Sequence, residues 1–407
     1  MAEEPIYLDY NATTPCDERV IEYMLPWFGR NFGNASSRQH IYGLRAAEVV
    51  KFSREKIASL IGCDTEEIFF TSGATESVNM VLKGVAEIYQ SKGKHIITAA
   101  TEHAAVRDTC RSLEAKGFSV SYLTPDQSGI IDPASIEAAV RPDTILIALM
   151  WANNETGVIQ PVDAYSKIAA KHGIIFFTDA TQALGKIATT VKENGIGAMA
   201  FSAHKIYGPK GVGAVFISRK NPRVKLAPLI EGGGQEKNLR SGTLNVPGIA
   251  GFGEAVKIIG AGMKDEFERT RILRNLFENA ILKNEEVYVN GNIHNRLPGV
   301  SNLCFRYTDG AALLSALNKK LAVSAGSACS SASGEPSPVL LAMGLGRSAA
   351  YASIRFSIGR FTTTEEIHQA IAVVNDSLSQ IRASSYPDFK ELKRTASAAP
   401  EWNHPAV

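Results

Sequence analysis

Residues 201–213, with the sequence FSAHKIYGPKGVG, place a lysine between a short apolar run and a turn rich in Gly and Pro. We expect Lys205 to lie on a tight turn directly after a strand, where its amine is held in a fixed position. A partly desolvated lysine amine forms a Schiff base with a carbonyl compound, and the neighbouring Ser202 and His204 offer donors to an anion. Pyridoxal phosphate has both groups. A surface lysine before a glycine-rich hairpin explains this segment alone equally well.

Two later segments also carry residues suited to chemistry. Residues 323–337 hold six serines, two glycines and one cysteine, Cys329. Because nothing in this composition packs into a core, we expect a mobile surface loop over about residues 324–337 that exposes a reactive thiol; an incidental free cysteine is the alternative. Arg355 alternates with apolar residues in a strand predicted at 353–358. It either meets solvent or clamps a carboxylate with two parallel N–H donors.

Apolar runs separated by helical stretches predict a largely parallel, doubly wound sheet. The runs lie at residues 95–99, 119–123, 144–150, 174–178, 198–202 and 213–217. His103, Asn154, Asp179 and Gln182 follow the ends of predicted strands, where ligands collect in such sheets. Each of these residues alone is more often a cap or a loop residue, but their common placement favours a binding site.

The strand predicted at residue 68 leads through Gly73 into a helix with apolar residues at 78, 81, 82, 85 and 89. Such a junction binds anions, because Ala74 and Thr75 present backbone N–H groups and a hydroxyl at the helix N-terminus. The segment has neither a GxGxxG nor a P-loop pattern, so a capped crossover helix is the alternative. Asn34, in the polar loop at 31–37, either faces a ligand or completes a turn.

The composition excludes several classes of protein. The chain has 407 residues, of which 45% are apolar and 21% charged, and this predicts a large buried core in two or three domains. A net charge of +2 without a basic block gives no expectation of nucleic-acid binding. No apolar run is long enough to span a bilayer, and residues 1–7 do not resemble a signal peptide, so we expect no membrane association and a cytoplasmic location. Five cysteines without a C-x-x-C pair argue against a zinc site or a disulfide framework.

Taken in order, the motifs resemble those of the cysteine desulfurases of the IscS/NifS type, which are fold-type I, aminotransferase class V enzymes. They extend over nearly the whole chain: YLDYNATTP at 7–15, TSGATES at 71–77, TEH at 101–103, NNE at 153–155, DATQ at 179–182, SAHKIYGPKG at 202–211, RSGT at 240–243, GSAC at 326–329 and IRFSIGRFT at 354–362. The resemblance implies a large domain, residues 15–260, with a mainly parallel seven-stranded sheet flanked by helices. A smaller α+β domain would comprise residues 1–14 and 261–407, including the cysteine loop and the C-terminal tail.

The resemblance also implies how pyridoxal 5'-phosphate would be held. Lys205 would form the Schiff base and later move the substrate Cα proton. His103 would stack on the ring and assist proton transfer, and Asp179 would pair with the pyridinium nitrogen, which makes the ring an electron sink. The other implied cofactor contacts are those of Gln182 and Asn154 near the ring oxygen, and those of Ala74, Thr75, Ser202, His204 and, from the neighbouring subunit of a homodimer, Thr243 at the phosphate.

The implied reaction converts L-cysteine to L-alanine. Arg355 would clamp the substrate carboxylate, with Asn154 and Asn34 beside the substrate. The Cys329 thiolate would attack the substrate sulfur and carry it as a persulfide to an iron–sulfur scaffold protein and other acceptors, for cluster assembly and tRNA thiolation. No resident metal is implied, although Cys329 could transiently ligate a nascent cluster together with the scaffold.

Three other functions are compatible with parts of this pattern. An aminotransferase has no need of a thiol in a Ser/Gly loop, so Cys329 argues against it. A selenocysteine lyase is less easily excluded. A sulfur-relay platform with vestigial catalysis is disfavoured because Lys205, Asp179, His103 and Cys329 all occur together.

Overall fold

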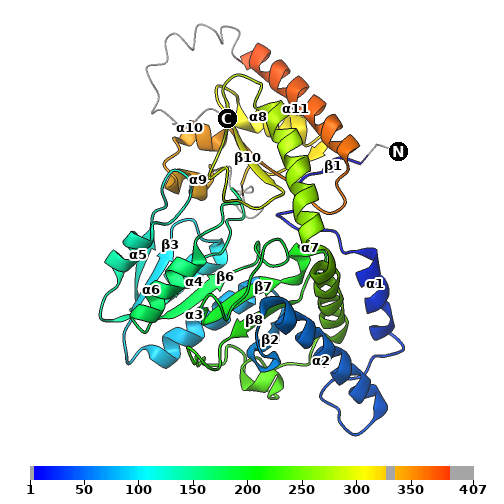
Figure 1. The fold of residues 1–407 in the computed structure, drawn as a ribbon, viewed down its shortest axis with the longest axis vertical. Coiled ribbons are helices and arrows are strands. Elements are labelled where there is room, and N and C mark those ends of the chain that lie inside the picture. The colour runs from blue at the N-terminus through cyan, green and yellow to red at the C-terminus, as the bar shows by residue number, and fades with distance from the viewer. Residues whose placement is uncertain (1–3, 327–334, 386–407) are drawn as a thin grey trace.

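The structure, a computed structural model, describes residues 4–326 and 335–385 and contains a seven-stranded sheet in its larger part (Figure 1). The strand order is β2, β8, β7, β6, β5, β3, β4, and β8 alone runs antiparallel to its neighbours in this sheet. The strands are β2 (Ile68–Thr71), β3 (His95–Ala99), β4 (Ser119–Leu123), β5 (Thr144–Ala148), β6 (Ile175–Asp179), β7 (Ala198–Ser202) and β8 (Gly213–Ile217). The predicted mainly parallel sheet is therefore confirmed.

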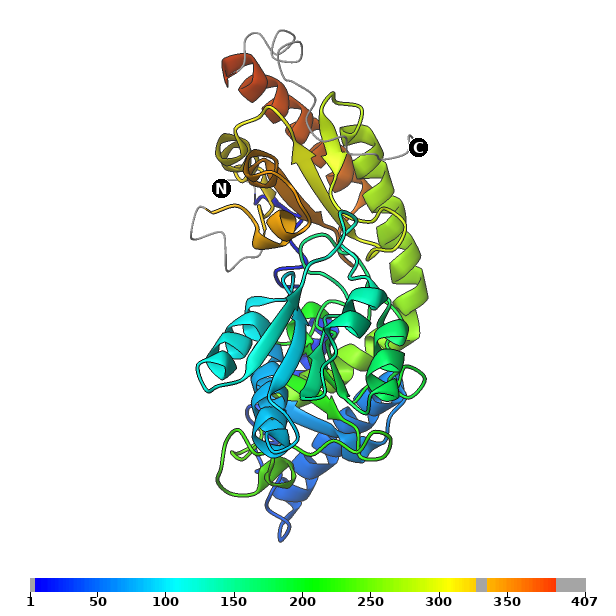
Figure 2. The ribbon, with the colours of Figure 1, turned by 90° about the vertical axis from the view of Figure 1, so that its left-hand side faces the viewer.

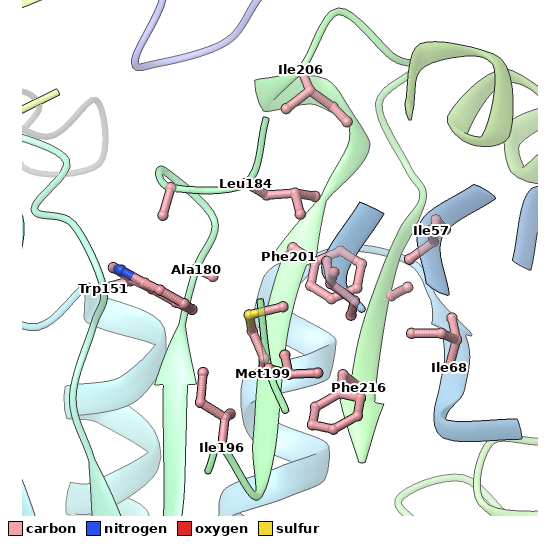
Figure 3. Packing of buried hydrophobic residues seen from close by; sticks show 14 of the residues in the cluster. Ile57, Ile68, Trp151, Ala180, Leu184, Ile196, Met199, Phe201, Ile206 and Phe216 are labelled. Atoms are coloured by element: carbon pink, nitrogen blue, oxygen red, sulfur yellow. The ribbon is translucent and has the colours of Figure 1, made fainter. Parts of the chain in front are cut away.

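Helices cover both faces of this sheet, because its central strands are apolar on both sides. In β7, Met199 and Phe201 belong to one hydrophobic cluster, whereas Ala198 and Ala200 belong to the cluster on the opposite face. Figure 3 shows Met199 and Phe201 beside Phe216 of β8. The helices of this part are α1 (Glu18–Met24), α2 (Ile41–Ile61), α3 (Ala74–Tyr89), α4 (Ala104–Glu114), α5 (Pro133–Ala139) and α6 (Val162–Lys171).

Short 3-10 turns connect several of these elements. They are η1 (Leu25–Trp27), η2 (Thr65–Glu67), η3 (Ala203–Lys205) and η4 (Gln235–Asn238). The turn η3 follows β7 directly, so Lys205 lies on a tight turn at the end of a strand, as the sequence predicts.

The long helix α7 (Val246–Ile281) runs along one side of the molecule from the larger to the smaller part (Figures 1 and 2). The expected boundary at residue 260 falls inside it. The smaller part contains the antiparallel sheet β12-β10-β9 and the pair β1-β11. Its elements are β1 (Ile6–Tyr7), β9 (Val287–Val289), β10 (Val300–Phe305), α8 (Gly310–Leu317), β11 (Leu321–Ala322), α9 (Pro338–Ala342), α10 (Arg347–Tyr351), β12 (Ser353–Ser357) and α11 (Thr364–Ser385).

The beginning of the chain belongs to the smaller part. Leu8 is fully buried in a cluster with residues of α7, β10, β12 and α11. The backbone then crosses to the larger part, where the Thr14 N–H donates to the carbonyl of His204. Residues 8–14 therefore connect the two parts beside Lys205.

The expected surface loop at about residues 324–337 is wrong at its two ends, because both ends pack against the rest of the chain. Val323 lies in the core of the smaller part, and Ser324 is buried with its hydroxyl donating to Asp9. Ser337 is buried and accepts a hydrogen bond from the Leu340 N–H as the cap of α9. Cys329 lies outside the described residues.

No helix within residues 4–326 and 335–385 has the length and apolar character needed to cross a membrane. In the described part of the chain, Cys16, Cys63, Cys110 and Cys304 are free thiols, and no cluster of three potential metal ligands occurs.

Candidate active site

A cavity of about 460 Å³ lies at the carboxyl ends of the parallel strands. It brings together most of the residues that the sequence singles out. Those lining it are Ala74, Thr75, His103, Asn154, Asp179, Gln182, Ser202, His204, Lys205 and Arg355. Because they come from the carboxyl ends of five strands of the large sheet and from β12 of the smaller part, only the folded chain assembles this set.

Lys205 is held at the cavity wall by the beginning of the chain. Its Nζ donates to the backbone carbonyls of Asn11, at 2.6 Å, and Ala12, at 2.7 Å. The next residue, Ile206, is buried against Leu184 in the hydrophobic core shown in Figure 3. Apolar packing of Ile206 therefore fixes the backbone next to Lys205, and the two carbonyls hold its amine at the cavity.

One end of the cavity has the features of an anion site. Helix α3 begins at Ala74 after Gly73 and has no side-chain cap, so the N–H groups of its first turn have no partner within the helix. Ser202 and His204 line the same region. Gly213 of β8 allows this close arrangement, since a Cβ there would lie 2.7 Å from the Cα of Gly73.

His204 has a neutral ring near neutral pH. Its Nδ1 lies 3.0 Å from the Thr13 hydroxyl. Burial, with a further contribution from the charge of Lys205, lowers the pKa of His204 to about 4. Without a bound anion, the ring is therefore a neutral hydrogen-bonding group near neutral pH.

The negative charge of Glu76 would repel an anion at this site, but an ion pair with Arg240 compensates that charge. Its Oε1 lies 2.7 Å from Nε of Arg240, and its Oε2 accepts a hydrogen bond from the Ser72 N–H at 2.8 Å. The ion pair also ties the loop after η4 to the first turn of α3. The sequence does not predict a site role for either residue.

His103 follows β3 and Asp179 ends β6, the two strands that flank β5. His103 caps α4, and its Nδ1 accepts a hydrogen bond from the Ala105 N–H at 3.1 Å, which places the ring proton on Nε2. Burial lowers the pKa of His103, so this ring too is neutral near neutral pH. Asp179 ends β6, and its Oδ1 accepts from the Thr181 N–H at 2.9 Å.

Arg355 is almost completely buried, which excludes the solvent-exposed alternative. Only 1% of its surface is exposed. Its Nη2 lies 2.6 Å from Oδ1 of Asp9, and its Nη1 donates to the carbonyl of Asn154 at 2.9 Å. Its Nε has no protein partner among the described residues. The guanidinium of Arg355 is therefore fixed at the cavity wall, and it still has N–H donors available for a ligand.

Two predicted residues are not brought to this cavity, and a third lies outside the described residues. Asn34 is exposed, and its side-chain oxygen accepts a hydrogen bond from the Ser36 N–H at 2.9 Å, which completes a local turn. Thr243 is exposed on the loop after η4 and does not line the cavity of its own subunit. Cys329 is outside the described residues, so its position relative to the cavity stays a prediction.

Residues 11–13 line the cavity, although the sequence indicated no role for them beyond a strand and a turn. Their motif, YLDYNATTP, was a signal of family membership. Nothing in the residue types of this motif, however, predicts that the backbone carbonyls of Asn11 and Ala12 contact the amine of Lys205, almost two hundred positions later. Lys186, which contacts Gln182, was missed for the same reason.

The sequence and the fold agree with comparisons to known proteins. The aminotransferase class-V family model matches residues 6–370, so the chain belongs to that family. A cysteine desulfurase IscS from Pectobacterium carotovorum is 50% identical over 403 residues, covering 98% of this chain and 99% of that protein. These similarities confirm the resemblance to the cysteine desulfurases of the IscS and NifS type.

Two solved structures share the fold. A NifS-like protein is 36% identical with a TM-score of 0.86, and the match covers 92% of this chain and 100% of that one. The protein SspA in complex with cysteine is 37% identical with a TM-score of 0.79, covering 88% of this chain and 100% of that one.

Proposed function

We propose that this chain is a cysteine desulfurase that binds pyridoxal 5'-phosphate in the 460 Å³ cavity and converts L-cysteine to L-alanine. The observation that carries the proposal is that Lys205 lines the same cavity as the anion site at α3 and the buried Arg355. The relatives support the same reaction, since one is an IscS cysteine desulfurase and another was solved with cysteine.

The residues present fit the cofactor of this pyridoxal phosphate-dependent family. The first turn of α3, with Ser202 and His204, would hold a phosphate. Asp179 would hold a protonated ring nitrogen, and the buried Thr181 hydroxyl, which has no protein partner among the described residues, is available to the bound group. When bound, the cofactor supplies an electron sink for carbanion chemistry.

The protein's own residues supply binding and proton transfer. Arg355 would bind the substrate carboxylate, using donors that the Asp9 and Asn154 contacts leave available. Lys205 would take the proton from the substrate Cα, and the neutral His103, whose Nε2 carries a proton, would assist its transfer.

The sulfur would leave through Cys329. Its thiolate attacks the substrate sulfur, an S–S bond forms, and the Cβ–S bond breaks with its electron pair retained on the carbon that becomes the methyl group of alanine. Protonation of that carbon completes alanine and leaves a persulfide on Cys329. Iron–sulfur scaffold proteins and other acceptors, including those of tRNA thiolation, would then remove the sulfur.

A homodimer is part of the proposal. Thr243 is exposed on a loop that the Arg240–Glu76 ion pair fixes to the anion site, and in a dimer it would reach the partner's phosphate. Several large apolar side chains are exposed on residues 25–44, and the rings of Phe32 and Tyr42 lie 5.4 Å apart. Contact with a second copy would remove this apolar surface from water. A cytoplasmic location stays a prediction.

The test is alanine release from L-cysteine by the purified protein with added pyridoxal phosphate, together with the visible absorbance of the bound cofactor. Lys205→Ala should abolish both signals, whereas Lys171→Ala, at an exposed lysine on α6, should leave both unchanged. A wild-type protein that neither takes up pyridoxal phosphate nor releases alanine would overturn the proposal.

A further inference from the structure

Lys186 lies next to the cavity without lining it. It follows β6 in a turn where the Lys186 N–H donates to the carbonyl of Ala183 and the Leu184 N–H to that of Ala180. Gly185 in this turn has φ +72°, and a Cβ there would lie 2.9 Å from the side chain of Ile259. The turn is therefore tightly packed, and its spacing brings the side chain at 186 beside the one at 182.

The Lys186 amine contacts the carboxamide of Gln182 directly. Its Nζ donates to Gln182 Oε1 at 2.7 Å and to the side-chain oxygen of Asn11 at 3.2 Å. Gln182 Nε2 donates to the backbone carbonyl of Asn11 at 2.9 Å. The oxygen end of the carboxamide is thus held by an amine and the nitrogen end by a carbonyl, so its orientation is defined.

The same contacts connect Gln182 to Lys205. The Asn11 carbonyl that accepts from Gln182 also accepts from the Lys205 amine at 2.6 Å. Gln182 is buried and lines the cavity. Its Nε2 has a second hydrogen, which is available to a ligand atom near Lys205.

We propose that Lys186 is a positioning residue that fixes and polarises the Gln182 carboxamide, so that Nε2 donates a strong hydrogen bond to an anionic ring oxygen of the ligand. A positive donor on Oε1 draws electron density from the amide and makes its N–H groups better donors. Without Lys186, Oε1 would be left buried and unpaired, and the carboxamide would lose its fixed position.

The surroundings of the amine are consistent with this role. Burial lowers the pKa of Lys186 to about 7, with the charges of Lys205 and Arg355 adding to the effect and Glu266 opposing it. The group keeps N–H donors in both protonation states, so the contact with Oε1 persists through this range, while the polarisation of the amide is strongest below the pKa, where the amine is charged.

This role rests on the proposed function, because it assigns the ring oxygen to pyridoxal phosphate. The test measures the dissociation constants of pyridoxal 5'-phosphate and of 3-deoxypyridoxal 5'-phosphate, which lacks that oxygen, with the ligand-free protein. Lys186→Met should weaken binding of pyridoxal phosphate roughly tenfold, as expected for one hydrogen bond to a charged group, and leave the 3-deoxy analogue nearly unaffected.

Two further variants make the result specific. Gln182→Leu should show the same ligand dependence, and the double variant should be no weaker than either single one, because both remove one interaction. Lys186→Gln restores a donor to Oε1 and should recover most of the affinity. If Lys186→Met does not fold, Lys186→Ser is a second variant that removes the amine. Lys171→Met, at an exposed lysine, is the control.

Equal weakening of both ligands by Lys186→Met would show that Lys186 is merely structural, and no weakening of either would also overturn the inference. In both cases a wild-type protein that binds pyridoxal phosphate leaves the proposed function standing. If the wild-type protein binds neither ligand, the proposed function fails and the role of Lys186 fails with it.

Discussion

Asp9 Oδ1 lies 2.6 Å from Nη2 of Arg355, although 346 positions separate the two residues in the chain. The other oxygen of the same carboxylate accepts from the Ser324 hydroxyl at 2.8 Å. Asp9 therefore orients the guanidinium and ties it to the segment that precedes the cysteine loop. An arginine buried to this degree needs such a partner, since an unpaired buried charge is strongly destabilising.

Asp9→Asn should raise the KM for L-cysteine by roughly tenfold while changing kcat less, because it loosens the group that we propose binds the substrate carboxylate. Steady-state kinetics would measure this, with Asp376→Asn on the exposed side of α11 as the control. A lower KM would instead show that Asp9 competes with the substrate for Arg355.

Glu102 is a buried carboxyl group near the site, and its protonation should affect the stability of the protein. Its Oε1 accepts from the Met150 N–H at 2.7 Å, while its buried Oε2 has no protein partner among the described residues. Burial, with a contribution from Asp179, raises the pKa of Glu102 well above the usual 4.5. The folded protein therefore keeps Glu102 protonated at pH values where the unfolded chain has released the proton.

The sign of the pH effect follows from this raised pKa. The contribution of Glu102 to stability is fully present below pH 4.5 and is lost as the pH rises toward the raised pKa, at up to about 1.4 kcal/mol per pH unit. Glu102→Gln does not titrate, so its thermal stability relative to wild type should increase between pH 5 and pH 8. The difference should be absent for Glu365→Gln at an exposed position, and a pH-independent difference for Glu102→Gln would contradict the assignment.

The sheet could be predicted because each strand is a compact apolar run followed by a loop, and β7 shows why. Its residues 198–202 are buried on both faces, so the run has no polar member before Ser202. The predicted cofactor residues at the strand ends then followed from topology, since parallel strands bring their carboxyl ends to one edge. Lys205 and Asp179 are positioned in this way.

The contacts that could not be predicted join segments far apart in the chain. No local pattern indicates that the carbonyls of Asn11 and Ala12 hold the Lys205 amine, or that Asp9 pairs with Arg355, because these contacts form only when the two parts of the chain meet. Asn34 illustrates the converse. A loop asparagine has the chemistry to bind a ligand, but its side chain here satisfies a local N–H instead.

The proposed dimer makes a separate prediction. Phe28 and Phe32 are 66% and 68% exposed, and replacing both with glutamate should prevent association by placing charge in an apolar contact. Analytical ultracentrifugation should show dimers for the wild type and monomers for this variant, which should also release pyridoxal phosphate more readily because Thr243 of a partner is absent. Ile272→Glu, at an exposed apolar residue on α7, is the control. A monomeric wild type that retains its cofactor tightly would contradict the dimer.

The most direct test of the central claim is mass spectrometry of the peptide containing Cys329 after one turnover with L-cysteine. The proposed reaction predicts one added sulfur atom on that peptide in the wild type and none in Lys205→Ala. The Cys329→Ser variant should still change the visible absorbance of the bound cofactor when cysteine is added, since Lys205 and Arg355 are intact, but it should release almost no alanine because a serine hydroxyl is a far weaker nucleophile toward sulfur. Alanine and sulfide formation at near wild-type rates by Cys329→Ser, with no persulfide on the wild-type peptide, would contradict the assignment of this protein as a desulfurase that carries sulfur on Cys329.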